Sequence, residues 1–229
     1  EYRSPLIVGT GPGLSASLAR LFARHGLAVS LAARQTDKLA ALVKETGAEA
    51  HACNAADPAA VASLFGKLDA AGRTPDVVVY NASNRVRGPL VDLAPDDVRR
   101  AMEISAFGGF LVSQQAAIRM QPKSHGAIFL TGATAGVKGF ALSATFAMGK
   151  FALRGLAQSM ARELSPKGIH VAHFVIDGGI RSEGRPVPDN APDSLLDPDA
   201  IAETYWATLQ QHRSAWSWEI EVRPWVEKF

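Results

Sequence analysis

The chain has 229 residues, of which 47% are hydrophobic and 20% are charged, so it carries enough apolar surface to fold without metal or disulfide. Its net charge of +2 is scattered along the sequence rather than gathered in a basic run, which argues against nucleic acid or membrane as a partner. No apolar stretch approaches the roughly 20 residues that span a bilayer, and the single cysteine, Cys53, favours a reduced, cytoplasmic setting. The sequence leaves open whether a leader or tag was removed before Glu1.

Short apolar runs alternate along the chain with segments of helical periodicity. We predict a strand where an apolar run is bounded by turn residues, and a helix where apolar residues recur every three to four positions. Thr36 is the predicted cap of the second helix. The predicted strands are 6–8, 29–32, 48–53, 76–80, 127–131, 170–176 and 218–222, and the predicted helices are 14–22, 37–46, 61–70, 95–120, 140–164 and 200–211.

The regular alternation of strands and helices predicts the fold class. Such a pattern is typical of a doubly wound parallel sheet with right-handed crossovers and helices on both faces. Because no linker or internal repeat divides the chain, we predict one Rossmann-like α/β domain over residues 1–229, arranged in three αβα layers.

Residues 181–199 break this rhythm, with four prolines and several acids. A structureless segment of this length is usually a lid or a disordered loop. It would leave the sheet after the sixth strand, at the edge where ligands bind in such folds. We therefore interpret it as a substrate lid rather than as disorder, and its apolar residues Val187, Leu195 and Leu196 suggest a partly hydrophobic pocket.

A glycine-rich turn follows the first predicted strand. Gly9, Gly11 and Gly13 lie where a dinucleotide pyrophosphate would meet backbone N–H groups and the positive end of a helix. A glycine cluster also suits a plain strand-to-helix turn, but its position at the start of a repeating βαβ array favours dinucleotide binding.

The residue that follows the second strand indicates which dinucleotide is bound. An acid there binds the ribose 2′-hydroxyl of NAD, whereas an arginine accommodates the 2′-phosphate of NADP. The sequence has Ala33 followed by Arg34, so it favours NADP(H) over NAD(H), although Arg34 could also be a solvated loop residue. We expect no metal.

These motifs resemble, in order and spacing, those of the short-chain dehydrogenase/reductase family over nearly the whole chain. Its TGxxxGxG turn is similar to residues 8–15, with Ser15 in place of the last glycine, and its NNAG motif is similar to residues 80–83. The resemblance implies cofactor contacts at Gly9, Gly11, Gly13, Leu14, Arg34, Asn54, Ala55, Asn81, Ala82, Lys150 and Gly178.

The family's YxxxK motif lines up with residues 146–150, where Phe146 takes the place of the tyrosine and Lys150 is retained. In the family the tyrosine protonates the substrate oxygen, and general acid catalysis of this kind contributes about 10²- to 10⁴-fold. Phenylalanine has no proton to give. The resemblance therefore implies that Lys150, on the same helix face, binds the cofactor ribose, while the source of the proton is altered.

Other catalytic positions of the family are also replaced. Its serine falls on Ala133, so Thr134, or less favourably Thr131, would have to take that role, and its supporting asparagine falls on Ser105. Asp177, before Gly178, stands where the family has proline. Thr134 and Asp177 are our candidate proton donors, because both should face the carboxyl edge of the sheet. His173 is interpreted as a satisfied buried histidine.

The resemblance implies an NADP-dependent oxidoreductase with an atypical active site, transferring hydride to or from a small carbonyl, alcohol or imine. The alternative is a non-catalytic NADP-binding sensor or partner subunit, in which Phe146 marks lost chemistry. We expect a homodimer or homotetramer, because the last strand and its flank pack at oligomer interfaces in the family. The tryptophans near that strand could equally pack within one monomer. The substrate is not predicted beyond a small molecule.

Overall fold

A computed structural model describes residues 1–227, so the last two residues of the predicted domain lie outside the described part. Seven strands form one sheet in the order β3-β2-β1-β4-β5-β6-β7, and every neighbouring pair is parallel. The strands are β1 (Pro5–Val8), β2 (Ser30–Ala33), β3 (Glu49–Ala52), β4 (Val77–Tyr80), β5 (Gly126–Thr131), β6 (Ile169–Ile176) and β7 (Glu219–Val222).

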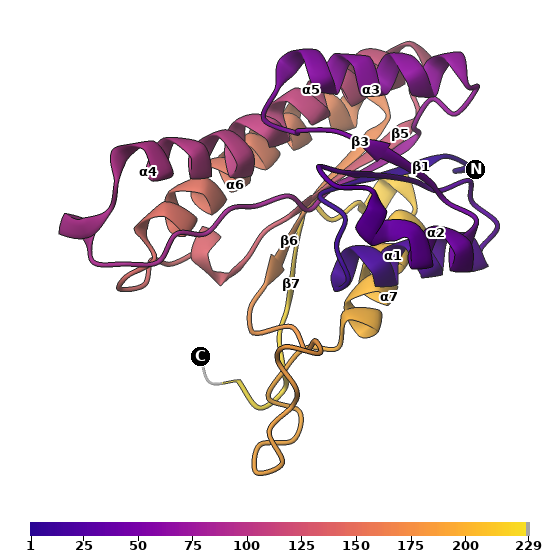
Figure 1. The fold of residues 1–229 in the computed structure, drawn as a ribbon. Coiled ribbons are helices and arrows are strands. Elements are labelled where there is room, and N and C mark those ends of the chain that lie inside the picture. The colour runs from indigo at the N-terminus through magenta and orange to yellow at the C-terminus, as the bar shows by residue number, and fades with distance from the viewer. Residues whose placement is uncertain (228–229) are drawn as a thin grey trace.

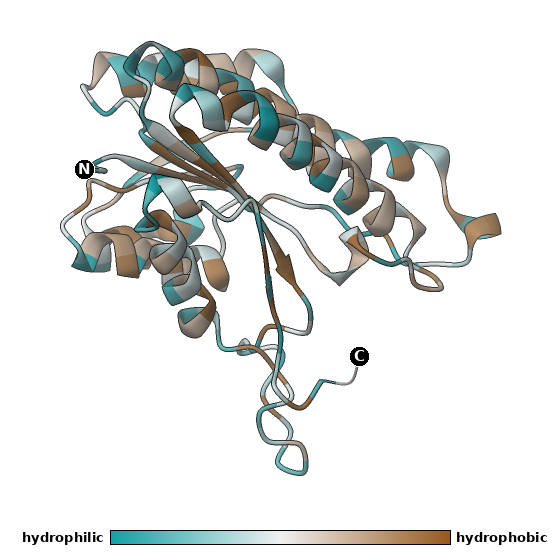
Figure 2. Cartoon of the chain, turned by 180° about the vertical axis from the view of Figure 1, so that it is seen from behind, coloured by the Kyte–Doolittle hydropathy of each residue, from teal (hydrophilic) through white to brown (hydrophobic). Residues whose placement is uncertain are grey.

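Helices cover both faces of this sheet and give three layers (Figures 1 and 2). The predicted doubly wound Rossmann-like fold is therefore confirmed. One face carries α1 (Leu14–Arg24), α2 (Ala40–Thr46) and α7 (Pro198–Leu209), and the other carries α3 (Pro58–Ala70), α4 (Pro95–Met102), α5 (Gly108–Met120) and α6 (Ala144–Leu164).

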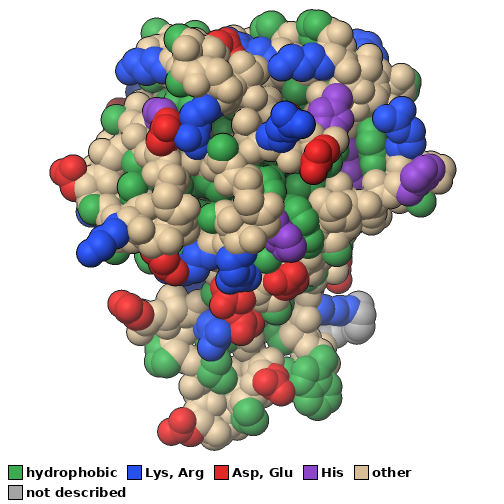
Figure 3. All heavy atoms as spheres, turned by 90° about the vertical axis from the view of Figure 1, so that its right-hand side faces the viewer, with side chains coloured by type: hydrophobic (Ala, Val, Ile, Leu, Met, Phe, Trp, Pro, Cys, Tyr) green, Lys and Arg blue, Asp and Glu red, His purple; other side chains and the backbone are tan. Residues whose placement is uncertain are grey.

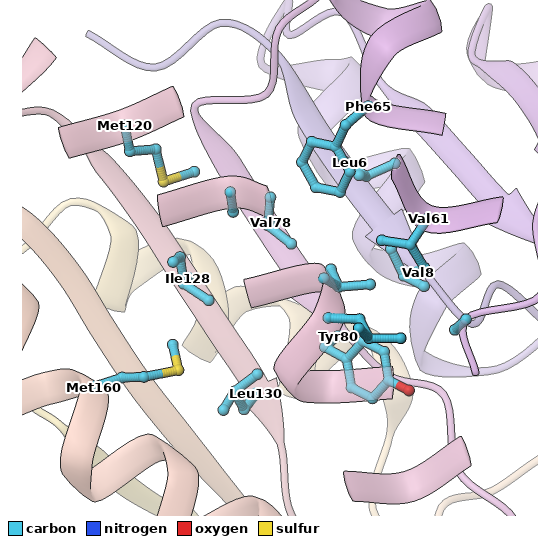
Figure 4. Packing of buried hydrophobic residues seen from close by; sticks show 14 of the residues in the cluster. Leu6, Val8, Val61, Phe65, Val78, Tyr80, Met120, Ile128, Leu130 and Met160 are labelled. Atoms are coloured by element: carbon cyan, nitrogen blue, oxygen red, sulfur yellow. The ribbon is translucent and has the colours of Figure 1, made fainter. Parts of the chain in front are cut away.

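The core is divided by the sheet into two apolar clusters. Because successive strand residues point to opposite faces, Leu6 and Val8 of β1 enter one cluster and Ile7 enters the other. Figure 4 shows the first cluster, in which Phe65 of α3 and Met160 of α6 pack toward the central strands. Cys53 is buried in the same cluster, as a small core residue.

Two helix starts differ from the sequence prediction. Helix α3 begins at Pro58, earlier than predicted, because the Asp57 carboxylate accepts hydrogen bonds from Ala59 N and Ala60 N at 2.8 and 3.3 Å. The predicted Thr36 cap is wrong, because Thr36 has helical backbone angles, makes no side-chain cap bond and precedes a 3₁₀ turn at Asp37–Leu39.

The two long predicted helices are also modified. Residues 95–120 are helical, but a π turn at Glu103–Phe107 separates α4 from α5. Helix α6 begins at Ala144 rather than at 140, because Leu142 has a φ of +62°, in the left-handed region. The predicted helix 200–211 is α7, which starts two residues earlier.

The 181–197 segment has no helix or strand, although Ile180 bridges to Leu196 and Ser182 to Arg185. With the C-terminal tail it projects below the body of the molecule (Figure 1). Figure 3 shows the projection from another side, with acidic and basic side chains interspersed over that face. Within residues 1–227, no helix combines the length and apolar character that crossing a bilayer requires.

Candidate active site

The sheet register brings the ends of the central strands into one row. Val8 pairs with Tyr80, and Tyr80 pairs with Leu130, so the residues that follow them are Gly9, Asn81 and Thr131. Neighbouring strands lie about 4.8 Å apart, which places the glycine turn after β1 within roughly 10 Å of the end of β5. The order of connections reverses at β1, and ligands of open α/β sheets bind at such a point.

Gly9 allows the turn to approach the end of β4. Its φ is +88°, and a Cβ atom there would lie 2.3 Å from Ala82 N. Its backbone N–H donates to Ala32 O at 3.0 Å, as does that of Thr10 at 3.1 Å. The turn is therefore fixed between β2 and the residues after β4, where only glycine fits at position 9.

The rest of the turn faces open space. A Cβ atom at Gly11 or Gly13 would meet nothing within 4 Å, and no side chain caps the start of α1 at Gly13. Asn81 Nδ2 donates to Ser15 Oγ at 2.7 Å, and Ser15 Oγ donates to Gly9 O at 3.2 Å. These bonds hold the turn in place.

Other predicted cofactor contacts lie at the ends of β2 and β3. Arg34 is exposed just after β2, and within residues 1–227 its guanidinium has no hydrogen bond or ion-pair partner. Asn54 is exposed after β3, and its Oδ1 accepts from Ala56 N at 3.2 Å. Ala55 is buried, as is the side chain of Leu14, so both can offer only backbone groups to a ligand.

Lys150 is a buried amine at the end of β5. Its Nζ donates to Thr131 O at 2.6 Å, and only 3% of the residue is exposed. Burial removes the ammonium group from water and lowers the pKa of Lys150 to about 8. Helix α6 can pack closely against the π turn that carries Ser105 because Gly149 has no side chain. A Cβ atom at Gly149 would lie 2.7 Å from Ser105 Cβ.

Phe146 lies one turn before Lys150 and is half-buried. Lys150 Nζ is 5.7 Å from the centroid of its ring, and Arg85 Cζ is 5.2 Å from the same centroid. Sequence reasoning missed Arg85. Its position could have indicated a role, because Arg85 comes four residues after Asn81, on the segment that leaves the carboxyl end of β4.

The hydroxyl residues near Lys150 have different surroundings. Ser105 is fully buried, and its Oγ accepts from Asn84 N at 3.0 Å. Ala133 is extended and precedes a 3₁₀ turn, and Thr134 Oγ1 donates to Ile176 O at a long 3.5 Å. Thr131 Oγ1 shares a 2.9 Å hydrogen bond with the buried hydroxyl of Tyr205, which favours Thr134 over Thr131 for the role of the family's serine.

Asp177 and Gly178 follow β6. Asp177 Oδ2 lies 4.0 Å from Arg223 Nη1, so its carboxylate faces a guanidinium. Gly178 has a φ of +151°, and a Cβ there would lie 2.9 Å from Pro224 Cδ. The segment after β6 is thus packed against the C-terminal tail.

The buried His173 is only partly satisfied, contrary to the prediction. Its Nδ1 lies 3.0 Å from Glu219 Oε2, whereas its Nε2 is buried and has no hydrogen-bond partner among residues 1–227. Both Glu219 oxygens also accept from Arg154 at 2.7 Å. Desolvation lowers the pKa of His173 despite the nearby carboxylate.

The 181–197 segment lies beside the glycine turn. A cavity of about 710 Å³ separates them, and Arg181, which lines it, donates from Nη2 to Asp197 Oδ2 at 2.6 Å. No group of histidine, cysteine or carboxylate side chains suited to a metal is found among residues 1–227. The cavity is lined by Pro12, Gly13, Arg181, Ser182, Glu183, Gly184, Pro186, Val187 and Pro198.

Comparison with known families decides the classification. A family model described as short chain dehydrogenase matches residues 4–185, which is more than half of the chain. The chain belongs to the short-chain dehydrogenase family. Its glycine turn after β1 and the buried Lys150 of α6, which is bound to the end of β5, therefore lie at the carboxyl edge of the sheet in a dehydrogenase-family fold.

Three similar proteins illustrate the range of this dehydrogenase family. The chain is 32% identical to the cyclic-di-GMP-binding biofilm dispersal mediator protein of Escherichia coli, over 84% of this chain and 79% of that protein. It is 33% identical to trans-4-hydroxycyclohexanecarboxylate dehydrogenase of Sinomonas cyclohexanicum, over 72% and 68%. A metagenomic short-chain oxidoreductase in complex with NADP has a TM-score of 0.84 at 28% identity, with 96% of this chain and 97% of that chain covered.

Proposed function

We propose that the protein is an NADP-dependent oxidoreductase that transfers hydride to or from a small carbonyl, alcohol or imine substrate. The observation that carries this proposal is the buried Lys150 amine, held on Thr131 O in the same row of strand ends as the open glycine turn. A buried cation costs free energy, and its place beside a ligand-binding edge marks a functional site.

The residues of the turn fit a dinucleotide. The empty space over Gly11 and Gly13 would accept the pyrophosphate, and the unpaired Arg34 would bind the 2′-phosphate of NADP. Asn54 and Ala55 would contact the adenine end, and Asn81, Ala82 and Gly178 the opposite end. The family member crystallised with NADP supports this assignment.

When bound, NADPH supplies a hydride to the substrate carbon, so that a carbonyl or imine gains two electrons while NADPH becomes NADP⁺. The proton that completes the reduction must reach the substrate oxygen or nitrogen from another group. We propose that Phe146 takes the family's tyrosine position, where it shapes the pocket and donates nothing. Lys150 would orient the ribose through the N–H groups that Thr131 leaves free.

Two residues remain our proposed proton donors. Thr134 is the freer of the two, because its hydroxyl has only the 3.5 Å contact to Ile176 O. Asp177 faces Arg223, so its carboxylate is engaged by a guanidinium. Ser105 would act only by positioning, since its buried hydroxyl binds the Asn84 backbone. An already cationic imine would need no proton in the hydride step.

The substrate would enter beneath the 181–197 segment, which we propose as the lid, since residues 198 and 199 of the predicted lid begin α7. It borders the 710 Å³ cavity beside the glycine turn and has few hydrogen bonds to the body of the protein. The Sinomonas relative is named for a cyclic hydroxy acid, so small ring alcohols and ketones belong in the substrate panel. A cytoplasmic location and a homo-oligomeric state stay predictions.

In the first experiment the purified protein is titrated with NADPH and, separately, with NADH. Binding is measured by the fluorescence of the nicotinamide ring. We expect NADPH to bind at least tenfold more tightly, and Arg34→Gln to remove that preference without weakening NADH binding. If neither cofactor binds, the assignment of the turn, Arg34 and Lys150 is wrong.

The second experiment separates an enzyme from a sensor. NADPH oxidation is recorded against ketones, aldehydes and imines, with the parent protein and Phe146→Tyr. Turnover by the parent supports an enzyme with a displaced proton donor. Binding without turnover, with carbonyl reduction gained only in Phe146→Tyr, would instead support the non-catalytic sensor or partner subunit.

A further inference from the structure

The segment that carries Arg85 is fixed to helix α6 and the loop before it. Val86 N donates to Thr145 Oγ1 at 3.2 Å, and the same hydroxyl donates to Val86 O at 2.7 Å. Gly88 N donates to Leu142 O at 3.1 Å. With the Asn84 N to Ser105 Oγ bond, these contacts hold the backbone on both sides of Arg85, so the arginine is not on a free loop.

The fixed backbone places the Arg85 guanidinium over the Phe146 ring, at 5.2 Å from its centroid. A guanidinium on an aromatic face keeps the donors at its edge available for a planar anion. Within residues 1–227 those donors have no hydrogen bond or ion-pair partner. The side chain is therefore positioned without being neutralised.

A second cation contacts the same ring. Lys150 Nζ is 5.7 Å from the Phe146 centroid and is bound to a neutral carbonyl, Thr131 O. Of the acids near this edge, Asp177 already faces Arg223. Two cations around one ring, with no carboxylate paired to either in the described chain, leave a local excess of positive charge that an anionic ligand would offset.

We propose that Arg85 binds a carboxylate of the substrate, so that the enzyme acts on small oxo- or hydroxycarboxylic acids. A carboxylate matches the two parallel N–H groups of a guanidinium edge. Its negative charge would anchor the substrate beside Phe146 and leave the carbonyl or alcohol carbon for hydride transfer. This inference rests on the proposed function, because it takes the Phe146 ring as a wall of the substrate pocket.

The test uses unreactive probes and a binding readout. Acetate, butyrate, cyclohexanecarboxylate and benzoate are titrated calorimetrically into the NADP-loaded protein, each against its own amide. We expect the parent to bind at least one acid about tenfold more tightly than its amide, and Arg85→Gln to remove that preference. Arg87 lies on the same segment and is exposed like Arg85, but it has no contact with the Phe146 ring among the described residues, so Arg87→Gln is the matched control and should keep the preference.

The outcomes separate this inference from the proposed function. NADPH affinity is measured first in every variant and should not change in Arg85→Gln. If NADPH does not bind the parent, the proposed function fails. If NADPH binds but no acid is preferred over its amide, or if the preference survives in Arg85→Gln, the carboxylate site is overturned and the cofactor assignment stands.

Discussion

Lys150 is a cationic side chain that the fold removes from water. Its pKa falls from the ordinary 10.5 to about 8 because the amine is buried, where it donates a hydrogen bond to Thr131 O. Below pH 8 both folded and unfolded chains hold the proton, and the folded state bears the cost of a buried charge. Between pH 8 and 10.5 the folded chain loses the proton first, so the unfolded chain binds more protons and stability rises with pH.

We predict that Lys150→Met abolishes this rise. Relative to the variant, the parent should gain about 3 kcal/mol in free energy of unfolding between pH 7.5 and 10.5, an order-of-magnitude figure from the pKa difference. Urea unfolding at several pH values measures it, and ionisation of the tyrosines cancels because both proteins share them. Parallel stability curves for the two proteins would show that Lys150 titrates normally.

Gly9 and Gly13 form a matched pair at the same turn. Gly9→Ala places a Cβ 2.3 Å from the Ala82 backbone at a positive φ, so we expect a loss of about 2–4 kcal/mol in stability. Gly13→Ala meets nothing within 4 Å, so stability should change by less than about 1 kcal/mol while NADPH binding weakens. Thermal unfolding with NADPH titration checks both. Equal destabilisation by the two substitutions would contradict the geometry of the turn.

At the scale of elements, Asp57 decides where α3 begins. Its carboxylate satisfies two backbone N–H groups that the first turn would otherwise leave unpaired. Asp57→Ala should cost about 1 kcal/mol of stability, whereas Asp57→Ser should retain most of it because serine also caps. Chemical unfolding of the three proteins is the measurement. If Asp57→Ser lost as much stability as Asp57→Ala, capping by the side chain would not explain the contribution of Asp57.

The sequence predicted the elements that depend on neighbouring residues in the chain. It missed the features that depend on contacts between segments distant in the chain. Apolar runs such as Val77 to Tyr80 identify a buried strand by themselves, and all seven strands were placed. The start of α6 was missed because the left-handed Leu142 depends on its neighbours in space. The motifs selected Lys150, but neither its Thr131 partner nor the approach of Arg85 to Phe146 follows from spacing, since both join segments distant in the chain.

At the scale of the whole molecule, the predicted homo-oligomer requires a surface that would join its subunits. The C-terminal tail exposes fewer tryptophans for an interface than the sequence suggested. Trp216 stacks on His170, and Trp218 packs against the core. A stronger candidate is the outer face of α6, of α5 and of the end of the π turn that precedes α5. Five apolar side chains there are 41–56% exposed, and Phe107 and Phe110 stack on each other. They are Phe107, Phe110, Ile118, Met148 and Phe151.

An exposed apolar stripe on two adjacent helices is typical of a subunit interface, because association removes it from water. We therefore predict a dimer or tetramer in light scattering coupled to size exclusion. The double variant Phe110→Glu, Phe151→Glu should convert the oligomer to a monomer. Its circular dichroism should not change, since both side chains are solvent-exposed in the single chain. Trp225→Ser, at an 81% exposed apolar residue of the tail, is the control and should leave the assembly unchanged. Dissociation by Trp225→Ser alone would instead place the interface at the tail, beside the 181–197 segment that we propose as the lid.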